Sequence, residues 1–149
     1  MEKGDHVDDF ELCDETGTPR KLSEFLAKGP VVLFFYPAAL TLGCTRESCH
    51  FRDVGAEFTA AGAQRIGIST DPVDKQKKFS EKHSFDYPLL ADADGTITTM
   101  FGVRRKGGRA KRETFVIAPD GTVLDVVKSE LRFNVHADRA LEVLQASDS

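Results

Sequence analysis

Apolar runs of strand length alternate along this chain with segments whose apolar residues recur at helical spacing. Residues 31–36 (VVLFFY) are continuously apolar, which is typical of a strand covered on both faces inside an α/β sheet. From residue 44 to residue 61 the apolar positions follow a helical period, at Phe51, Val54, Phe58 and Ala61. The pattern predicts a buried central strand, a short loop and a helix over residues 44–61, before the helix stop at Gly62.

The same kind of pattern assigns the remaining elements. Further strands are predicted at residues 9–13, 19–22, 65–69, 89–91, 114–117 and 123–127. Further helices are predicted at residues 23–26, 72–82, 96–101 and 135–145, with Ser23, Asp71 and Asn134 as candidate N-caps. Strands and helices alternate and a hairpin and a closing helix follow. This order predicts an α/β fold with a mixed central sheet, flanking helices and an N-terminal hairpin.

Length and composition limit the class of protein. The 149 residues match one domain, with 40% hydrophobic and 30% charged residues. A net charge of −4 argues against a nucleic-acid partner. No stretch approaches the roughly 20 apolar residues that cross a bilayer, and the N-terminus lacks a signal-peptide core. We therefore expect a single domain over residues 1–149, a cytoplasmic location and no membrane partner.

The candidate chemistry lies in the cysteines. Cys13, Cys44 and Cys49 are odd in number, which does not fit a structural disulfide framework. Cys44 follows the central strand and begins the next helix, where free N–H groups and the helix dipole favour the nucleophilic thiolate. The loop after such a strand is also the usual place for an α/β active site. Cys44 is therefore the candidate nucleophile.

The spacing from Cys44 to Cys49 restricts what the two thiols do together. Five helical residues separate Cα atoms by about 8–9 Å, beyond the roughly 7 Å limit of an unstrained disulfide. If the two cysteines pair, the first helical turns must unwind. The spacing is not C-x-x-C, and two thiols with His50 are too few for a zinc site. We expect neither a metal nor a cofactor.

The segment around Cys44 resembles a known family. Pro37, Thr41 and Cys44 stand in the three fixed places of the peroxiredoxin motif Pro-x-x-x-Thr/Ser-x-x-Cys. A second cysteine five residues later, followed by Phe-Arg-Asp at residues 51–53, resembles the bacterioferritin-comigratory, or peroxiredoxin Q, subgroup. The similarity continues through residues 67–71, 87–92, 101–103 and 112–117, so it covers nearly the whole chain. Together with the element order, it implies a thioredoxin-like fold.

The resemblance implies a role for each site residue. Cys44 would be the peroxidatic cysteine, oxidised by hydrogen peroxide or an organic hydroperoxide to a sulfenic acid, and Cys49 the resolving one that closes a disulfide. The Thr41 hydroxyl would bond the thiolate and the peroxide, Pro37 would shield the pocket, and Arg112 would be the active-site arginine. Thioredoxin or a similar dithiol donor would then reduce the disulfide. The chain would be a monomer or weak dimer.

Some features depart from that pattern or remain outside it. Leu42 replaces the proline usual in the subgroup, which removes a fixed φ ahead of Cys44 and is expected to loosen the loop. Cys13 has no partner in sequence and is expected to be a packing residue. Six of the nine residues at 104–112 are basic, which indicates a solvated loop, a docking patch for an acidic reductase, or electrostatic help near Cys44.

Other interpretations of the same residues stay open. The Cys44–Cys49 pair would equally serve a redox sensor that signals by local unfolding. A thioredoxin-like binding module without activity is a third reading. Cys49 could be idle in an enzyme resolved by an outside thiol, Thr41 could be only a helix cap, and Arg112 could be one more surface charge.

Overall fold

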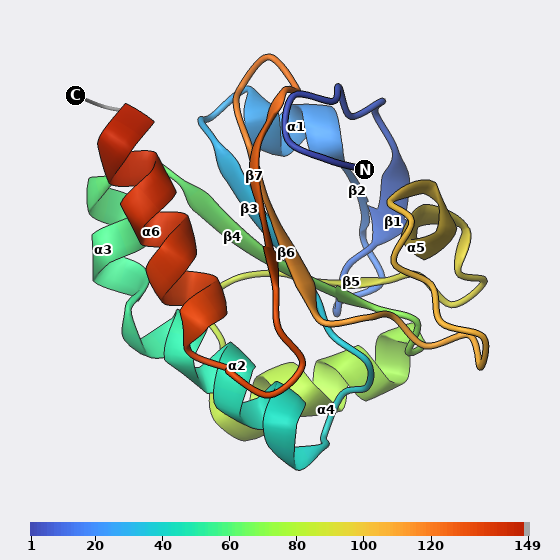
Figure 1. The fold of residues 1–149 in the computed structure, drawn as a ribbon. Coiled ribbons are helices and arrows are strands. Elements are labelled where there is room, and N and C mark those ends of the chain that lie inside the picture. The colour runs from blue at the N-terminus through green and yellow to red at the C-terminus, as the bar shows by residue number, and fades with distance from the viewer. Residues whose placement is uncertain (148–149) are drawn as a thin grey trace.

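The computed structural model describes residues 1–147, within which seven strands form one mixed sheet in the order β2-β1-β5-β4-β3-β6-β7 (Figure 1). The strands are β1 (Glu11–Cys13), β2 (Pro19–Lys21), β3 (Val31–Phe35), β4 (Gln64–Ser69), β5 (Leu89–Ala91), β6 (Glu113–Ile117) and β7 (Val123–Lys128). The helices are α1 (Leu22–Leu26), α2 (Leu42–Asp53), α3 (Gly55–Ala60), α4 (Val73–His83), α5 (Thr96–Met100) and α6 (Val135–Ser147).

β3 is an interior strand of the sheet, as its apolar run predicts. It pairs with β4 in parallel and with β6 in antiparallel orientation, and all five of its residues are buried. The predicted N-terminal hairpin is also present, with β1 and β2 antiparallel and β1 joined to β5. Because β3 lies inside the sheet between β4 and β6, the loop after it opens among the strand ends and not beside an outer strand.

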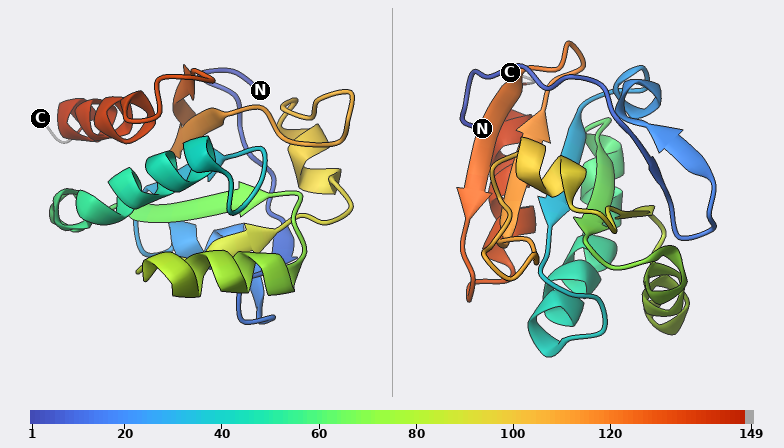
Figure 2. Two further views of the ribbon diagram at one scale, coloured as in Figure 1. Left: turned by 90° about the horizontal axis from the view of Figure 1, so that it is seen from below. Right: turned by 90° about the vertical axis from the view of Figure 1, so that its right-hand side faces the viewer.

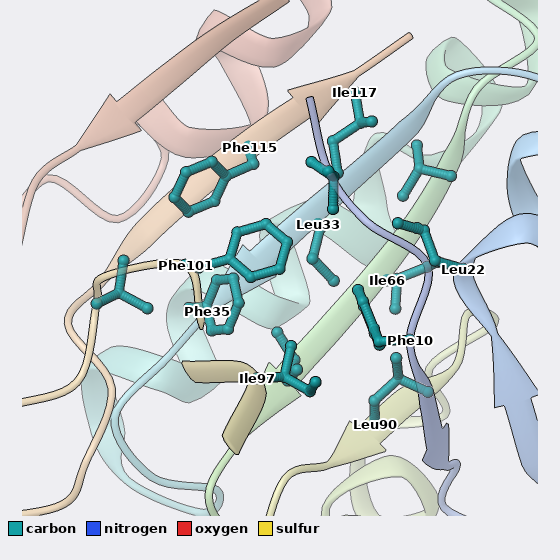
Figure 3. Packing of buried hydrophobic residues seen from close by; sticks show 14 of the residues in the cluster. Phe10, Leu22, Leu33, Phe35, Ile66, Leu90, Ile97, Phe101, Phe115 and Ile117 are labelled. Atoms are coloured by element: carbon teal, nitrogen blue, oxygen red, sulfur yellow. The ribbon is translucent and has the colours of Figure 1, made fainter. Parts of the chain in front are cut away.

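Two hydrophobic layers cover the two faces of the sheet. Alternate residues of β3 face opposite sides, so Leu33 and Phe35 join the layer under α1 and α5 shown in Figure 3. Val32 and Phe34 join the layer under α2, α3, α4 and α6. There the Phe34 ring stacks on Phe51 of α2 with centroids 4.1 Å apart. The right-hand view of Figure 2 shows α5 and α6 on opposite sides of the sheet.

The predicted helix over residues 44–61 is wrong in one respect, because it is broken at Val54. In a continuous helix the Phe51 carbonyl would accept the N–H of Gly55. Here that carbonyl accepts from Arg65 Nη1 at 2.9 Å, and a Cβ at Gly55 would lie 2.8 Å from the same guanidinium. Asp86 holds Arg65 through a 2.9 Å ion pair. A long-range contact from β4 therefore ends α2 and starts α3.

Two predicted caps are also wrong. Ser23 lies inside α1, and its N–H and hydroxyl both donate to Asp9, each at 2.8 Å. Asp9 therefore serves the helix start from an upstream segment. Pro72 stands at the N-cap of α4, and the Asp71 carboxylate accepts from the Ala39 N–H at 2.7 Å. Asp71 thus supports the loop after β3 and touches α4 through a 3.4 Å ion pair with Lys75, without standing at the N-cap.

Within residues 1–147, no helix has the length and apolar character needed to cross a membrane.

Candidate active site

The loop after β3 places Cys44 as the third residue of α2, with its side chain 1% exposed. Leu40 in that loop has φ 67°, a left-handed conformation that non-glycine residues rarely adopt. The loop is held from the end of β4, because Asp71 accepts both the Ala39 N–H and the Ser69 hydroxyl, each at 2.7 Å. These bonds fix the entry of the chain into α2 and hence the position of the sulfur.

Thr41 stands at the N-cap position of α2, but its side chain makes no capping bond. Its hydroxyl donates to the Ala38 carbonyl at 2.8 Å. Two consequences follow. The first-turn amides around Cys44 keep their capacity to stabilise an anion, and the Thr41 oxygen keeps its two acceptor lone pairs. Donation from this hydroxyl to the sulfur would require the hydroxyl to rotate away from Ala38.

Leu42, where the subgroup usually carries proline, takes the first helical position of α2. Its side chain is 71% exposed. The helix therefore starts ahead of Cys44 without a proline to fix it, two residues earlier than the sequence predicts.

Arg112 contacts two residues of α2 through its two terminal guanidinium nitrogens. Its Nη2 lies 3.4 Å from Cys44 Sγ, and its Nη1 donates to Glu47 Oε1 at 3.0 Å. The side chain is 6% exposed, so it is not one more surface charge. Burial works to lower the pKa of Arg112, but the neighbouring Glu47 and Cys44 outweigh it and raise that pKa. The guanidinium therefore stays charged beside the sulfur.

Two further contacts fix the direction of Arg112. Glu130 accepts from the Arg112 Nε through its carbonyl at 3.2 Å and from the Arg112 backbone N–H through Oε1 at 3.0 Å. The Phe133 ring covers the guanidinium, with Cζ 4.9 Å from the ring centroid. The same ring lies where a Cβ at Gly43 would stand, 2.8 Å away, so only glycine fits there without displacement. Contacts with four residues, namely Cys44, Glu47, Glu130 and Phe133, thus fix the position of Arg112.

Glu47 and His136 complete the buried polar cluster, and both are fully shielded from solvent. Burial raises the pKa of Glu47 to about 8, although Arg112 opposes the shift. Burial also lowers the pKa of His136 to about 4. His136 Nε2 donates to the Ser129 carbonyl at 2.8 Å, so Nδ1 accepts from the Thr114 hydroxyl at 2.8 Å. Glu47 Oε2 has no hydrogen-bond partner among the described residues.

Sequence reasoning missed both members of this cluster. Glu47 carries a recognisable signal, because it lies one helical turn after Cys44 and so shares its face of α2. His136 carries none, since only the packing of α6 against the sheet brings it to Glu47.

Cys49 lies half-buried on the same unbroken helix as Cys44. Burial raises the pKa of its thiol, with Arg52 opposing the shift and Asp53 adding to it. All three cysteines are free thiols. In regular helix geometry the Cα atoms of Cys44 and Cys49 stand about 8–9 Å apart, so pairing requires the helix to open.

The structure leaves the other candidate residues outside this cluster. Pro37 is half-buried two residues after the end of β3. Cys13 is half-buried in β1, which β5 and β4 separate from β3. The basic segment at 104–112 is a hairpin closed by an Arg104–Ala110 bridge, with Arg105 paired to Glu130. Of its six cations, only Arg112 turns inward to the sulfur.

This arrangement suits attack by a sulfur anion on a small electrophile. Cys44 sits at a helix N-terminus with a fixed cation beside it, and both stabilise negative charge at the sulfur and on an atom bonded to it. Among residues 1–147, no group of three or more His, Cys, Asp or Glu side chains could hold a metal ion.

Comparisons with known proteins point to one family. A model described as the AhpC/TSA family matches residues 3–126. Peroxiredoxin Q of Sedum lineare chloroplasts is 38% identical over 146 residues, which cover 97% of this chain and 78% of the relative.

Solved structures agree with that match. The crystal structure of peroxidoxin BcpB from Mycobacterium tuberculosis has a TM-score of 0.96 and 59% identity, covering 100% of this chain and 99% of that one. Peroxiredoxin Q of Xanthomonas campestris has a TM-score of 0.85 and 31% identity, covering 94% of this chain and 92% of that one. These matches confirm the predicted thioredoxin-like fold with its mixed sheet.

Proposed function

The chain belongs to the AhpC/TSA family of peroxiredoxins, which are thiol-dependent peroxidases, and from this premise we propose that it reduces hydroperoxides through Cys44. The observation that carries the proposal is the Arg112 guanidinium, which bridges Cys44 Sγ and Glu47. In this role the Cys44 thiolate attacks one peroxide oxygen. The O–O bond breaks, the sulfur becomes a sulfenic acid, and the leaving oxygen takes a proton to form water or an alcohol.

Arg112 and the first turn of α2 would lower the barrier of that step. Negative charge moves from the sulfur to the leaving oxygen during the displacement. Fixed donors aimed at that region stabilise the transition state more than the ground state. Thr41 would accept a hydrogen bond from the hydroperoxide O–H with a free lone pair, and Pro37 would close the loop side of the pocket.

Cys49 would resolve the sulfenic acid. Its sulfur attacks Cys44, an S–S bond forms, the Cys44 S–O bond breaks, and water leaves with the proton from the Cys49 thiol. A dithiol protein of the thioredoxin type would then reduce the disulfide. The unbroken helix between the two cysteines makes opening of α2 a required part of this step.

The test is timed oxidation of the reduced protein with a small excess of hydrogen peroxide, with mass-spectrometric mapping of the product. Rapid loss of two hydrogens as a Cys44–Cys49 bridge, abolished in Cys44→Ser, is the expected result. An oxygen retained on Cys44 with Cys49 still free would remove Cys49 from the mechanism. Oxidation no faster than that of free cysteine would defeat the peroxidase.

Turnover separates the enzyme from a redox sensor built on the same cysteine pair. The proposal predicts many peroxide molecules consumed per protein when a dithiol is supplied. Oxidation that stops after one equivalent would favour the sensor.

A further inference from the structure

A groove beside Cys49 contains charges that the site chemistry does not use. It runs between α2 and the connection from β7 to α6, and we call it the Cys49 groove. Its walls are Arg46, Cys49, His50 and Asp53 on one side and residues 132–135 with Asp138 on the other. Figure 1 shows the β7–α6 connection passing beside α2. Cys49 therefore has an outlet to solvent on this side, whereas Cys44 is 1% exposed.

The charged side chains of the groove that have no ion-pair partner are both positive. Asp53 forms an ion pair with Arg52 at 3.0 Å, and Asp138 contacts His50 at 2.8 Å, an ion pair only when His50 is protonated, so neither acid is paired with Arg46 or Arg132. Arg46 and Arg132 are exposed, and neither forms an ion pair with any residue in the described part of the chain. Two free guanidinium groups thus flank the Cys49 thiol, on a chain whose net charge is −4.

Exposed leucines lie on the segments next to the groove, with Leu42 one helical turn before Arg46 and Leu131 directly before Arg132; together with Leu40 we call them the leucine rim. The described residues include four exposed large hydrophobic side chains, and three of them are Leu40, Leu42 and Leu131. Leu42 and Leu131 are 71% and 83% exposed. The segments that carry them meet, because the Phe133 ring packs against Gly43. Apolar side chains gathered around arginines are typical of protein–protein interfaces.

We propose that the Cys49 groove and its leucine rim form the docking surface for an acidic dithiol protein, whose carboxylates meet Arg46 and Arg132. The inference rests on the proposed function, since it names where the reductant of that same disulfide binds. A small anionic thiol would occupy the groove but leave Leu42 and Leu131 in water. Only a protein surface covers the cations and the leucines together.

The geometry also selects the sulfur that the partner attacks. A partner thiolate attacks Cys49 in the groove, the Cys44–Cys49 bond breaks, and Cys44 leaves as a thiolate beside Arg112. The second partner thiol then displaces Cys49, which takes a proton, and the partner is released as a disulfide. Opening of α2 shifts Arg46 and Cys49 on that wall of the groove, whereas Leu131 and Arg132 lie outside α2. Recognition of the oxidised protein therefore rests mainly on Leu131 and Arg132, and the test variants are placed at these two residues.

The experiment compares two reductants on one set of variants. Arg132→Glu and Leu131→Ser are assayed with a purified acidic thioredoxin, its reductase and NADPH, and separately with dithiothreitol. Lys28→Glu is the matched control, because this exposed lysine precedes β3 at the end opposite Cys44. We expect kcat/KM for thioredoxin to fall about tenfold in Arg132→Glu, and its salt dependence to weaken. Turnover with dithiothreitol should change less than about twofold, as expected for a charge that steers only a protein partner.

Each other result has a defined meaning. Unchanged thioredoxin kinetics in both variants would overturn the docking surface, as would a loss in Arg109→Glu of the basic hairpin instead. Turnover with dithiothreitol but none with thioredoxin would overturn the protein partner and leave the peroxidase intact. A wild-type dimer in sedimentation that Leu131→Ser dissociates would assign the surface to a second copy. No peroxide consumption with either reductant would defeat the proposed function itself.

Discussion

Glu47 Oε2 and His136 Nε2 lie 3.6 Å apart in the interior, yet at neutral pH they do not form an ion pair. Burial raises the pKa of Glu47 to about 8 and lowers that of His136 to about 4. These shifts favour a protonated Glu47 and a neutral His136 at pH 7. A neutral Glu47 leaves the charge of Arg112 directed at Cys44, 3.4 Å away.

The first prediction concerns the pH dependence of peroxide reduction. As the pH rises through about 8, Glu47 ionises and competes with the sulfur for Arg112. We expect kcat/KM for hydrogen peroxide to fall above that pH. Glu47→Gln should keep its neutral-pH rate and lose the alkaline decline, as quenched-flow thiol loss would measure. Superimposable profiles for the two proteins would contradict this.

A second prediction concerns stability. The folded-state pKa of Glu47, about 8, lies above its ordinary value of 4.5, so its stabilising contribution is lost as the pH rises toward 8. The folded-state pKa of His136, about 4, lies below its ordinary 6.5, so its loss occurs on the acid side, below 6.5. Of these two groups, only Glu47 changes its contribution between pH 6.5 and 8. The free energy of unfolding should fall there by about 2 kcal/mol.

Urea titrations at fixed pH values test that slope. Glu47→Gln removes the titrating carboxyl and should flatten the curve over this window. His136→Gln should leave the alkaline slope in place. A wild-type curve that stays flat from pH 6.5 to 8 would show that Glu47 is not protonated in the folded protein.

The third prediction is the loss caused by removing the guanidinium. Arg112→Gln should lower kcat/KM for peroxide by about 10²–10³, or roughly 3–4 kcal/mol, by analogy with a lost oxyanion-hole donor. Arg112→Lys retains the charge but not the two-pronged geometry and should recover only part of the rate. A Lys variant equal to wild type would mean that charge alone suffices.

A fourth prediction tests the contact that holds Arg112. In Gly43→Ala the new Cβ would stand 2.8 Å from the Phe133 ring and 3.2 Å from Arg112 Nη2. Overpacking of this kind costs about 1–3 kcal/mol, and the displaced guanidinium should slow peroxide reduction. Phe133→Ala in the same chain should relieve the clash. Strict additivity of the two changes in a double-mutant cycle would argue against direct coupling.

The fifth prediction follows oxidation itself. Because a Cys44–Cys49 disulfide does not fit the intact helix, the oxidised protein should lose far-UV helical signal and amide protection at residues 42–49. Dithiothreitol should restore both. An oxidised protein with full protection in α2 would exclude that pairing.

The sequence predicted those parts of the site that neighbouring residues determine. The apolar run at 31–36 and the motif from Pro37 to Cys44 place a thiol where a central strand meets a helix, and the structure has it there. Nothing in the basic segment at 104–112 distinguishes Arg112, as a site residue, from the five other cations of that segment. The family resemblance supplied that distinction, and the buried contact with Cys44 accounts for it.

The features that the sequence did not predict correctly have a different cause. Each of them depends on a contact between residues that are distant in sequence. The break at Val54 depends on Arg65, and the role of Asp71 depends on a loop 32 residues earlier. The Glu47–His136 contact spans two helices. Helix propensities and capping rules consider one segment of the chain at a time. They therefore cannot predict the effect of a side chain that contacts this segment from another strand.

The break between α2 and α3 also sets a boundary for local unfolding. Fraying travels along a helix because each turn supports the next through its hydrogen-bond ladder. Arg65 takes the carbonyl that would have joined the two helices, so the ladder stops at Asp53. We therefore expect α2 to open separately from α3, which the fully buried Phe58 anchors in the core. Opening confined to residues 42–49 would leave the buried Phe51 stacked on Phe34, so the last turn of α2 would remain as a template on which the helix re-forms.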